Sequence, residues 1–433
     1  MGLRIKVWDE LDSAARSAVF TRPAVRDDES IRSAVAEIVQ TVRSGGDAAV
    51  RALTRKFDGA EVDSLRVSED ELTAAVEKLE PRALDAIDLA IANVRRFHEP
   101  QFPSSIKVET MPGVSCKRVS HAIDSVGLYV PAGTAPLPST AIMLAVPAAI
   151  AGCPTCIMCT PPRADGTADP AILVAASRSG VTDIYKIGGA QAIAAMAYGT
   201  ETVPKVSKLF GPGNAWVTSA KAQAMADPGG ASIDMPAGPS EVLVIADKHA
   251  SAEFVAADLL SQAEHGADSQ VVLLTPSAEL AEQVQSEIEE QLAQLSRADI
   301  ARLALENSLT ILVRDIALAI EVSNRYAPEH LILQFDDAGE SLPNIRNAGS
   351  VFVGPWSPEA VGDYCSGTNH VLPTYGAANT YSGLGVDQFM RQMTVQELTR
   401  DGLAGLGNAV SALSQLEGLD AHAAAVTRRL GAS

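Results

Sequence analysis

The 433-residue sequence contains no apolar run long enough to cross a bilayer. Its longest apolar stretch, residues 141–153, includes a proline and falls short of the roughly 20 residues that a transmembrane helix needs. The first ten residues also lack the apolar segment followed by small residues that is typical of a secretory signal peptide. We therefore expect no membrane span, and the start of the chain is interpreted as mature protein.

Positive charge and cysteine are also scarce. The 34 Lys and Arg residues stand against 53 Asp and Glu residues, which gives a formal net charge of −19. A surface with this excess of negative charge repels nucleic-acid phosphates and anionic lipids, which argues against nucleic acid and membrane partners. Five cysteines, an odd number in a large chain, argue against a disulfide scaffold and for a reducing compartment. We expect a cytoplasmic protein.

The apolar pattern divides the chain into four parts. Residues 1–120 are charged and helical in period, and they predict a mainly helical N-terminal region that packs on the core. From residue 121, short apolar runs bounded by Gly and Pro alternate with Ala-rich helical segments, which is typical of a parallel sheet. Two such units follow each other, over residues 121–235 and 236–375. Residues 376–433, loop-rich and then helical, are too short for a third sheet and predict an appendage.

The two units are each expected to alternate strands with helices, which makes the fold class α/β. The expected strands cover residues 126–130, 155–159, 183–187, 241–245, 270–274, 309–313 and 350–353. The expected helices between them cover residues 141–151, 169–179, 190–198, 251–265, 276–295 and 315–325.

Histidines are few, seven in all, and four of them lie in the C-terminal half beside polar or acidic neighbours: His265, His330, His370 and His422. Gln262 and His265 are one turn apart on a predicted helix and share a face, so two metal ligands could converge there. The alternative for His265 is an interaction with the last carbonyls of the helix. Gln is an uncommon zinc ligand. His422 has no local signature and is typical of an ordinary helix residue.

Two further pairs combine acidic and imidazole side chains. Glu329 and His330 lead into an apolar strand, where a carboxyl beside an imidazole suits proton transfer, unless they form a surface ion pair. Asp363 and His370 bracket a loop that follows the expected strand at residues 350–353. Ligands in α/β proteins bind beyond the carboxyl ends of strands. Asp363 could instead cap its own turn.

The cysteine cluster has the spacing of a metal motif, with Cys153, Cys156 and Cys159 each three residues apart. If residues 155–159 form a strand, Cys156 and Cys159 point to opposite faces and cannot bind one ion. We therefore expect them to be buried core residues.

No dinucleotide fingerprint is present. The nearest candidates, residues 211–216 and 383–388, lack the third small residue of the G-x-G-x-x-G pattern. Several Gly- and Pro-rich loops remain, and such loops either let backbone amides approach a phosphate or ribose closely or simply form tight turns. Sequence rules alone do not predict NAD.

Several of these segments, taken in order from about Arg32 to Leu430, closely resemble the histidinol dehydrogenase family. The blocks that carry the resemblance are Tyr129-Val-Pro-Ala-Gly-Thr-Ala-Pro-Leu, Phe210-Gly-Pro-Gly-Asn-Ala, Asp234-Met-Pro-Ala-Gly-Pro-Ser-Glu-Val-Leu-Val-Ile-Ala-Asp, Ser261-Gln-Ala-Glu-His-Gly, Pro328-Glu-His-Leu and Gly362-Asp-Tyr-Cys-Ser-Gly-Thr-Asn-His-Val-Leu-Pro-Thr. The resemblance implies two tandem incomplete Rossmann-like units, a helical N-terminal region and a C-terminal helical appendage. It also implies an NAD site that lacks the glycine fingerprint.

The resemblance implies a role for each candidate residue. The implied zinc ligands are Gln262, His265, Asp363 and, from the C-terminal segment of the partner chain in a homodimer, His422. Oxygen and nitrogen donors suit zinc without excluding manganese or cobalt. The implied catalytic pair is Glu329 and His330. The substrate contacts are implied to be the zinc ligands and His330 together with Ser240, His370 and Glu417. The positions that match the NAD site are Tyr129, Gln191 and Asn214.

The implied activity is the NAD-dependent four-electron oxidation of L-histidinol to L-histidine through L-histidinaldehyde, the last steps of histidine biosynthesis. Three alternatives stay open: a relative that oxidises another small alcohol, a metal- or nucleotide-binding regulatory protein, and a zinc hydrolase. The hydrolase is disfavoured because no His-Glu-x-x-His spacing occurs. The acid and base side by side at Glu329 and His330 argue against a protein that only binds.

Overall fold

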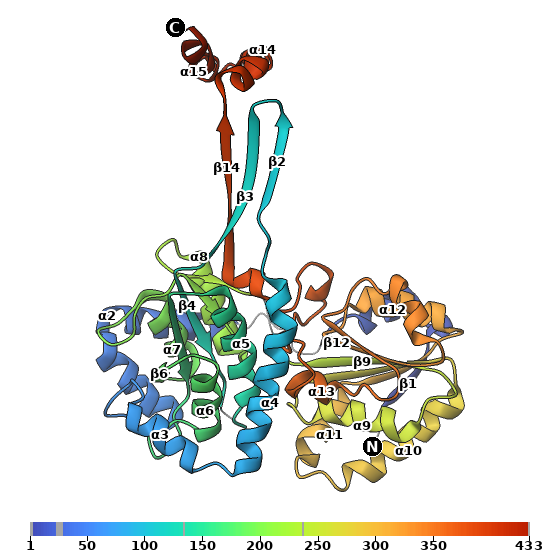
Figure 1. The fold of residues 1–433 in the computed structure, drawn as a ribbon. Coiled ribbons are helices and arrows are strands. Elements are labelled where there is room, and N and C mark those ends of the chain that lie inside the picture. Colours follow the sequence, from blue (N-terminus) through green and yellow to red (C-terminus); the bar gives the residue numbers. More distant parts are fainter. Residues whose placement is uncertain (1–2, 23–28, 133–134, 236–237, 432–433) are drawn as a thin grey trace.

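The computed structural model describes residues 3–22, 29–132, 135–235 and 238–431. Residues 133–134 and 236–237, which belong to two of the motifs quoted above, lie outside the described residues. Two parallel sheets, each covered by helices, form two units side by side, and a third, antiparallel sheet extends away from them as an arm (Figure 1). This arrangement confirms the predicted α/β class with two consecutive parallel-sheet units.

The sheet of the first unit has five parallel strands. They are β4 (Ser125–Tyr129), β5 (Thr155–Thr160), β6 (Asp183–Lys186), β7 (Lys208–Phe210) and β8 (Ser232–Ile233). Their spatial order is β6-β5-β4-β7-β8, so in chain order the sheet runs 3-2-1-4-5. This is the order of a doubly wound sheet without its sixth strand, and its switch point lies between β4 and β7.

The second unit repeats this order and adds one strand. Its strands are β9 (Glu241–Ala246), β10 (Gln270–Thr275), β11 (Leu309–Leu312), β12 (His330–Gln334) and β13 (Ser350–Val353). The added strand β1 (Arg4–Val7) pairs in parallel with β11 at the sheet edge, so the chain begins in the second unit. All residues of β9 and β10 are buried, as expected for central parallel strands covered on both faces.

Helices cover both faces of each sheet. In the first unit, α2 (Glu29–Asp58), α7 (Gly189–Tyr198) and α8 (Ala215–Ala226) share one core. The other face is covered by α3 (Glu69–Glu77), α4 (Pro81–His98), α5 (Pro138–Ala151) and α6 (Pro170–Arg178). In the second unit, α9 (Ala252–Ala263), α10 (Ala278–Leu292) and α11 (Ala298–Glu306) lie on one face. On the other face lie α1 (Ser13–Val19) and α12 (Ile316–Tyr326).

The arm corrects the sequence-based expectation that residues after 375 carry no sheet. Its strands β2 (Ile106–Met111), β3 (Val114–Ala122) and β14 (Met390–Leu398) pair antiparallel in the order β14-β3-β2. The hairpin β2–β3 also lies where a mainly helical region was expected. Beyond β14, the helices α14 (Arg400–Glu417) and α15 (Asp420–Gly431) pack together at the tip of the arm (Figure 1). None of the described helices is both long and apolar enough to span a membrane.

Candidate active site

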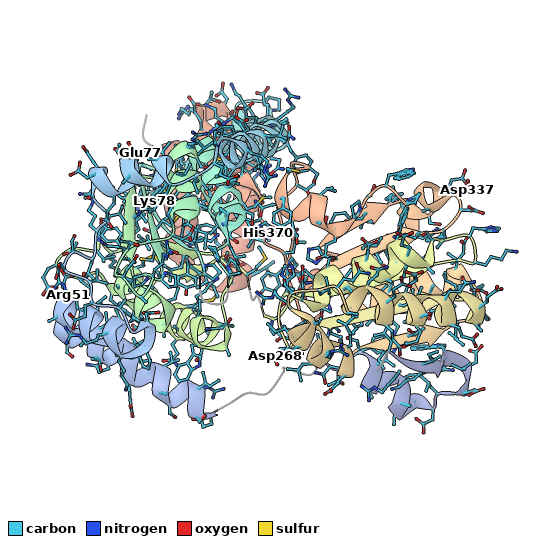
Figure 2. All side chains as sticks on the ribbon, turned by 90° about the horizontal axis from the view of Figure 1, so that it is seen from below. Arg51, Glu77, Lys78, Asp268, Asp337 and His370 are labelled. Carbon is cyan, nitrogen blue, oxygen red and sulfur yellow. The ribbon has the colours of Figure 1, made fainter. Side chains whose placement is uncertain are left out.

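A cavity of about 250 Å³ lies between the two units. Its lining includes seven of the residues singled out from the sequence: Asn214, Ser240, His265, Glu329, His330, Asp363 and His370. Viewed from below, His370 lies at the junction of the units (Figure 2). Side chains separated widely in the sequence therefore meet where both sheets end.

The carboxyl ends of strands in the first sheet and the amino ends of strands in the second sheet border this cavity. The first unit contributes residues just beyond the carboxyl ends of β4 and β7, including Pro131 and Asn214, which is its switch point. The second unit contributes residues at the amino ends of β9 and β12. Asp363 lies on α13 (Glu359–Tyr364), and its carboxylate approaches His330 at the amino end of β12. The expectation that Asp363 acts beyond the carboxyl end of the strand at residues 350–353 is therefore wrong, although Asp363 does line the cavity.

The Glu329–His330 pair is buried, which excludes the surface ion pair. Their side chains are 7% and 4% exposed. The main chain of Glu241 holds both: its N–H donates to Glu329 Oε2 at 2.9 Å, and its carbonyl lies 3.2 Å from His330 Nδ1. A carbonyl only accepts hydrogen bonds, so Nδ1 carries the proton and Nε2 keeps its lone pair. Among the described residues, Nε2 has no hydrogen-bond partner.

Burial sets the charge of this pair. It lowers the pKa of His330 to about 3, so the imidazole is neutral near pH 7 and the lone pair on Nε2 is not occupied by a proton. Burial also raises the pKa of Glu329 well above its usual range, against the opposing effect of the hydrogen bond from Glu241. A carboxyl with a raised pKa is a stronger proton acceptor once ionised.

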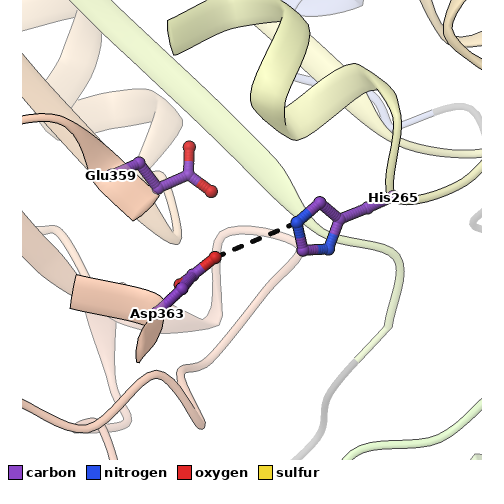
Figure 3. Close-up of side chains that lie close together, drawn as sticks. All are labelled: His265, Glu359 and Asp363. Carbon is purple, nitrogen blue, oxygen red and sulfur yellow. Dashed lines mark ion pairs between the residues drawn. The ribbon is translucent and has the colours of Figure 1, made fainter. Parts of the chain in front are cut away.

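His265, Glu359 and Asp363 form a group suited to a metal ion. Each offers a ligand atom within 4.8 Å of the others, and His265 Nε2 lies 3.9 Å from Asp363 Oδ2 (Figure 3). Gln262 lies one turn before His265 and is fully buried, and neither amide atom of its side chain has a partner among the described residues. The helix α9 ends at Ala263, so His265 lies just beyond it, with its N–H bonded to the carbonyl of Gln262.

Glu359 was missed in the sequence. It is 1% exposed, both its carboxylate oxygens lack partners among the described residues, and Oε1 lies 3.7 Å from His330 Nδ1. Burial and the neighbouring Asp363 raise its pKa well above the usual range, and burial raises the pKa of Asp363 to about 7. A divalent cation would supply the positive charge that these buried carboxyls lack. The sequence signal that could have identified Glu359 is its spacing of four residues from Asp363. This spacing places the two side chains on one face only if the segment is a helix, as α13 is.

The remaining lining residues come from both units. Asn214 is the N-cap of α8, and its Oδ1 accepts hydrogen bonds from the backbone N–H groups of Trp216 and Val217. Burial lowers the pKa of His370 to about 4, and its Nε2 has no partner among the described residues. Ser240 immediately precedes β9. These groups add polar atoms around the buried carboxyl groups and the imidazole of His330.

Tyr129 and Gln191 lie inside the first unit. Both are buried, and neither is among the described residues that line the cavity. The hydroxyl of Tyr129 accepts a hydrogen bond from the N–H of Gly189 at 3.1 Å, and Gln191 Nε2 donates to Asp58 at 3.3 Å. Burial raises the pKa of Asp58 to about 6. Tyr129 thus holds the first residue of α7, and Gln191 joins α7 to the last residue of α2.

Glu417 and His422 lie apart from all the others. They are on α14 and α15, exposed, at the tip of the arm and away from the cavity of their own chain (Figure 1). The structure therefore brings the seven lining residues together, with Gln262 buried one turn before His265, and it leaves Glu417 and His422 at the far end of the arm.

The cysteines behave as expected. Cys156 packs against the core on one face of the first sheet, whereas Cys159 belongs to the core on the other face. All five cysteines are free, and burial raises the pKa of Cys153 to about 11. The prediction that Cys156 and Cys159 point to opposite faces of the strand is confirmed; Cys159 is buried, whereas Cys153 and Cys156 are half-buried against the core.

Comparisons with known proteins find relatives over nearly the whole chain. The histidinol dehydrogenase family model matches residues 21–430. The histidinol dehydrogenase of Xanthomonas oryzae pv. oryzae is 55% identical over 429 residues, 99% of each chain. That of Vibrio cholerae is 54% identical over 428 residues, 99% of this chain and 98% of its own. The crystal structure of histidinol dehydrogenase from Elizabethkingia anophelis has a TM-score of 0.95 at 45% identity and covers 99% of this chain and 98% of that one.

The two parallel-sheet units and these matches define the class of the protein, an oxidoreductase. The matches extend over nearly the full length of both chains in each comparison. The chain belongs to the histidinol dehydrogenase family and is an enzyme of histidine biosynthesis.

Proposed function

We propose that the protein oxidises L-histidinol to L-histidine through L-histidinaldehyde, using NAD as the oxidant in both steps. The observation that carries this proposal is the cavity between the units, where a neutral buried imidazole and a buried carboxyl lie beside a group of metal-ligand type. An alcohol dehydrogenation needs a proton acceptor, and oxidation of the aldehyde also needs an activated water.

In the first step, His330 Nε2 would accept the hydroxyl proton. In the second, Glu329 would take a proton from the water that adds to the aldehyde and return it to the aldehyde oxygen, and His330 would accept a proton from the resulting diol. NAD, when bound, would supply the hydride acceptor for each step. The first step would release one proton, and the second would release two, one of them from ionisation of the carboxylic acid. The hydrogen bonds from the main chain of Glu241 fix both groups for these transfers.

The residues at the cavity fit a bound zinc ion. Gln262, His265 and Asp363 would hold it, and the unpartnered amide of Gln262 and the buried carboxyl of Asp363 support this assignment. Zinc there supplies a template that orients a substrate rich in nitrogen donors. Ser240 and His370 line the same cavity and would contact the substrate.

NAD would bind on the side of the first unit. The cavity borders the carboxyl ends of β4 and β7, the switch point at which doubly wound sheets bind their ligands. Asn214 lines it, and Tyr129 and Gln191 lie in the same unit. Gly211, directly after β7, has φ +119°, and a Cβ there would lie 2.2 Å from the carbonyl oxygen of Tyr129. Glycine thus lets this loop lie close to the end of β4.

We also propose a homodimer in which the arm of each chain reaches the cavity of its partner. Glu417 and His422 would then contribute a substrate contact and the fourth zinc ligand. Exposed leucines flank these residues: Leu413, Leu416 and Leu419 are 60%, 84% and 41% exposed. Apolar side chains gathered on an extended arm favour a protein interface.

The number of NADH molecules formed per L-histidinol, with the alcohol limiting, tests the proposed function. We expect two, and none after a zinc chelator has been added and removed. A single NADH per substrate would contradict the second oxidation. No NADH with histidinol would shift the proposal to another small alcohol.

Glu329→Gln is expected to slow aldehyde oxidation by about 100-fold or more, and alcohol oxidation much less. The Gln side chain can still accept the hydrogen bond from Glu241, but it cannot take a proton from water. The two steps are measured separately with histidinaldehyde and histidinol as substrates. The exposed Glu321→Gln on α12 is the matched control and should leave both rates unchanged. Equal losses in both steps would remove Glu329 from its assigned role.

A further inference from the structure

Glu241, the first residue of β9, is placed to control both catalytic groups. Its N–H and carbonyl bond to Glu329 and His330, so the position of one peptide segment sets both side chains. The side chain of Glu241 is 2% exposed and does not line the cavity among the residues described there. Whatever fixes Glu241 therefore acts on the catalytic pair without touching the substrate.

Arg22 holds this side chain. Its Nε donates to Glu241 Oε2 at 2.8 Å and its Nη2 donates to Oε1 at 3.0 Å, which makes a two-point contact. The Arg22 side chain is itself 5% exposed. Paired hydrogen bonds between a guanidinium and a carboxylate fix the relative orientation of both groups as well as their distance.

Arg22 also holds the segment that leads to the catalytic pair. Nη2 donates to the carbonyl of Tyr326 at 2.6 Å, and the guanidinium lies 3.6 Å above the ring of Tyr326. Tyr326 ends α12 just before Glu329, and its hydroxyl donates to Gln270 Oε1 at 2.8 Å. Arg22 thus joins the start of β9 to the end of α12. Strand β12, which begins at His330, pairs with β9 and follows α12 in the chain.

We propose that Arg22 is a positioning residue for the catalytic pair, acting through Glu241 and Tyr326. The inference rests on the proposed function and extends it to a residue of the N-terminal segment, 219 positions before Glu241. A guanidinium makes the contacts to Glu241 and to Tyr326 from one rigid plane, which the single ammonium of a lysine cannot reproduce. The charge alone is therefore not sufficient, and the geometry of the fork is needed.

Arg22→Lys tests this proposal, because it keeps the charge that neutralises Glu241. We expect a folded protein with wild-type zinc content and nearly unchanged KM for histidinol. Its kcat should fall by about 10- to 100-fold in both steps, the size of effect that a small misplacement of reacting groups produces. The measurements are kcat and KM for each step, zinc content by metal analysis and the thermal unfolding midpoint.

Arg22→Ala supplies a second readout, since added guanidinium at concentrations far below denaturing ones should restore part of kcat. The matched control is Arg43→Ala, which removes an arginine that also stacks on a tyrosine, Tyr198, and pairs with a carboxylate, Asp227, away from the cavity. It should leave kcat unchanged and show no rescue.

A folded Arg22→Lys protein with wild-type kcat would overturn the proposal, and so would a loss of kcat that only follows loss of zinc. If Arg22→Ala fails to fold, Arg22→Lys still decides. The wild-type protein in the same assay separates this result from a failure of the proposed function, because absence of NADH formation there concerns the function and not Arg22.

Discussion

Replacing His330 with Gln is expected to lower kcat by about 10²- to 10⁴-fold in both oxidation steps. In the proposed mechanism, His330 accepts a proton in each of them. Its Nδ1 is committed to the carbonyl of Glu241, and burial keeps the ring neutral near pH 7, so Nε2 is free to take the proton. A glutamine amide has nearly the same size but no comparable basicity.

The loss should therefore be the same in both steps, unlike the loss in Glu329→Gln. Rates with histidinol and with histidinaldehyde, measured separately with metal content and the unfolding midpoint, distinguish the two variants. His249→Gln is the control, because His249 is 58% exposed and lies opposite Asp336 at the surface. A folded, zinc-loaded His330→Gln protein that oxidises histidinol at the wild-type rate would exclude His330 as the base.

The buried strands could be predicted because a strand that is buried on both faces consists of a continuous run of apolar residues. β9 and β10 are continuous apolar runs bounded by loops, and every residue in them is buried. Their neighbouring helices, such as α9 and α12, begin and end close to the predicted positions for the same reason. A helix with one face on a core shows the apolar period of that face.

The strands of the arm contain no such continuous apolar run. Five of the six residues of β2 are exposed, and seven of the nine residues of β14. Apolar residues in these strands are therefore no sign of a buried face: Ile106 and Val108 of β2 alternate with polar residues, yet they are 42% and 50% exposed. The pairing of β14 with β3 also joins segments far apart in the chain, so no local turn signal announces it. Chain length alone suggested that the last residues could not build a sheet, and they build it with strands from another region.

The site was predictable where its chemistry is local. Glu329 and His330 are adjacent, and Gln262 and His265 are one turn apart, so spacing brought each pair to attention. Glu359 and the Arg22–Glu241 contact were not predictable in this way. Arg22 and Glu241 are 219 positions apart, and an isolated arginine in a sequence does not disclose that it is buried against a carboxylate.

The proposed exchange of arms predicts that two inactive variants restore each other. Asp363→Asn removes a proposed zinc ligand that lines a chain's own cavity, whereas His422→Asn removes one that this chain would supply to its partner. Each homodimer should lose zinc and activity. In the heterodimer, isolated with two different affinity tags, the His422→Asn chain keeps Asp363 and receives the native His422 of the other chain. It should therefore contain one intact site and about half of the wild-type activity and zinc per dimer.

Two further pairings make this result specific. A heterodimer of Asp363→Asn with His265→Asn has a defect in each cavity, so it should regain nothing. A chain carrying both Asp363→Asn and His422→Asn, paired with the wild-type chain, should also be inactive, because one defect lies in its own cavity and the other reaches its partner's. If His422 instead served its own chain, the heterodimer of the double variant with the wild-type chain would keep half of the activity. The heterodimer of Asp363→Asn with His422→Asn would then have none. These two heterodimers thus give opposite results depending on whether His422 serves the partner chain or its own chain. Metal analysis measures the same difference without relying on activity.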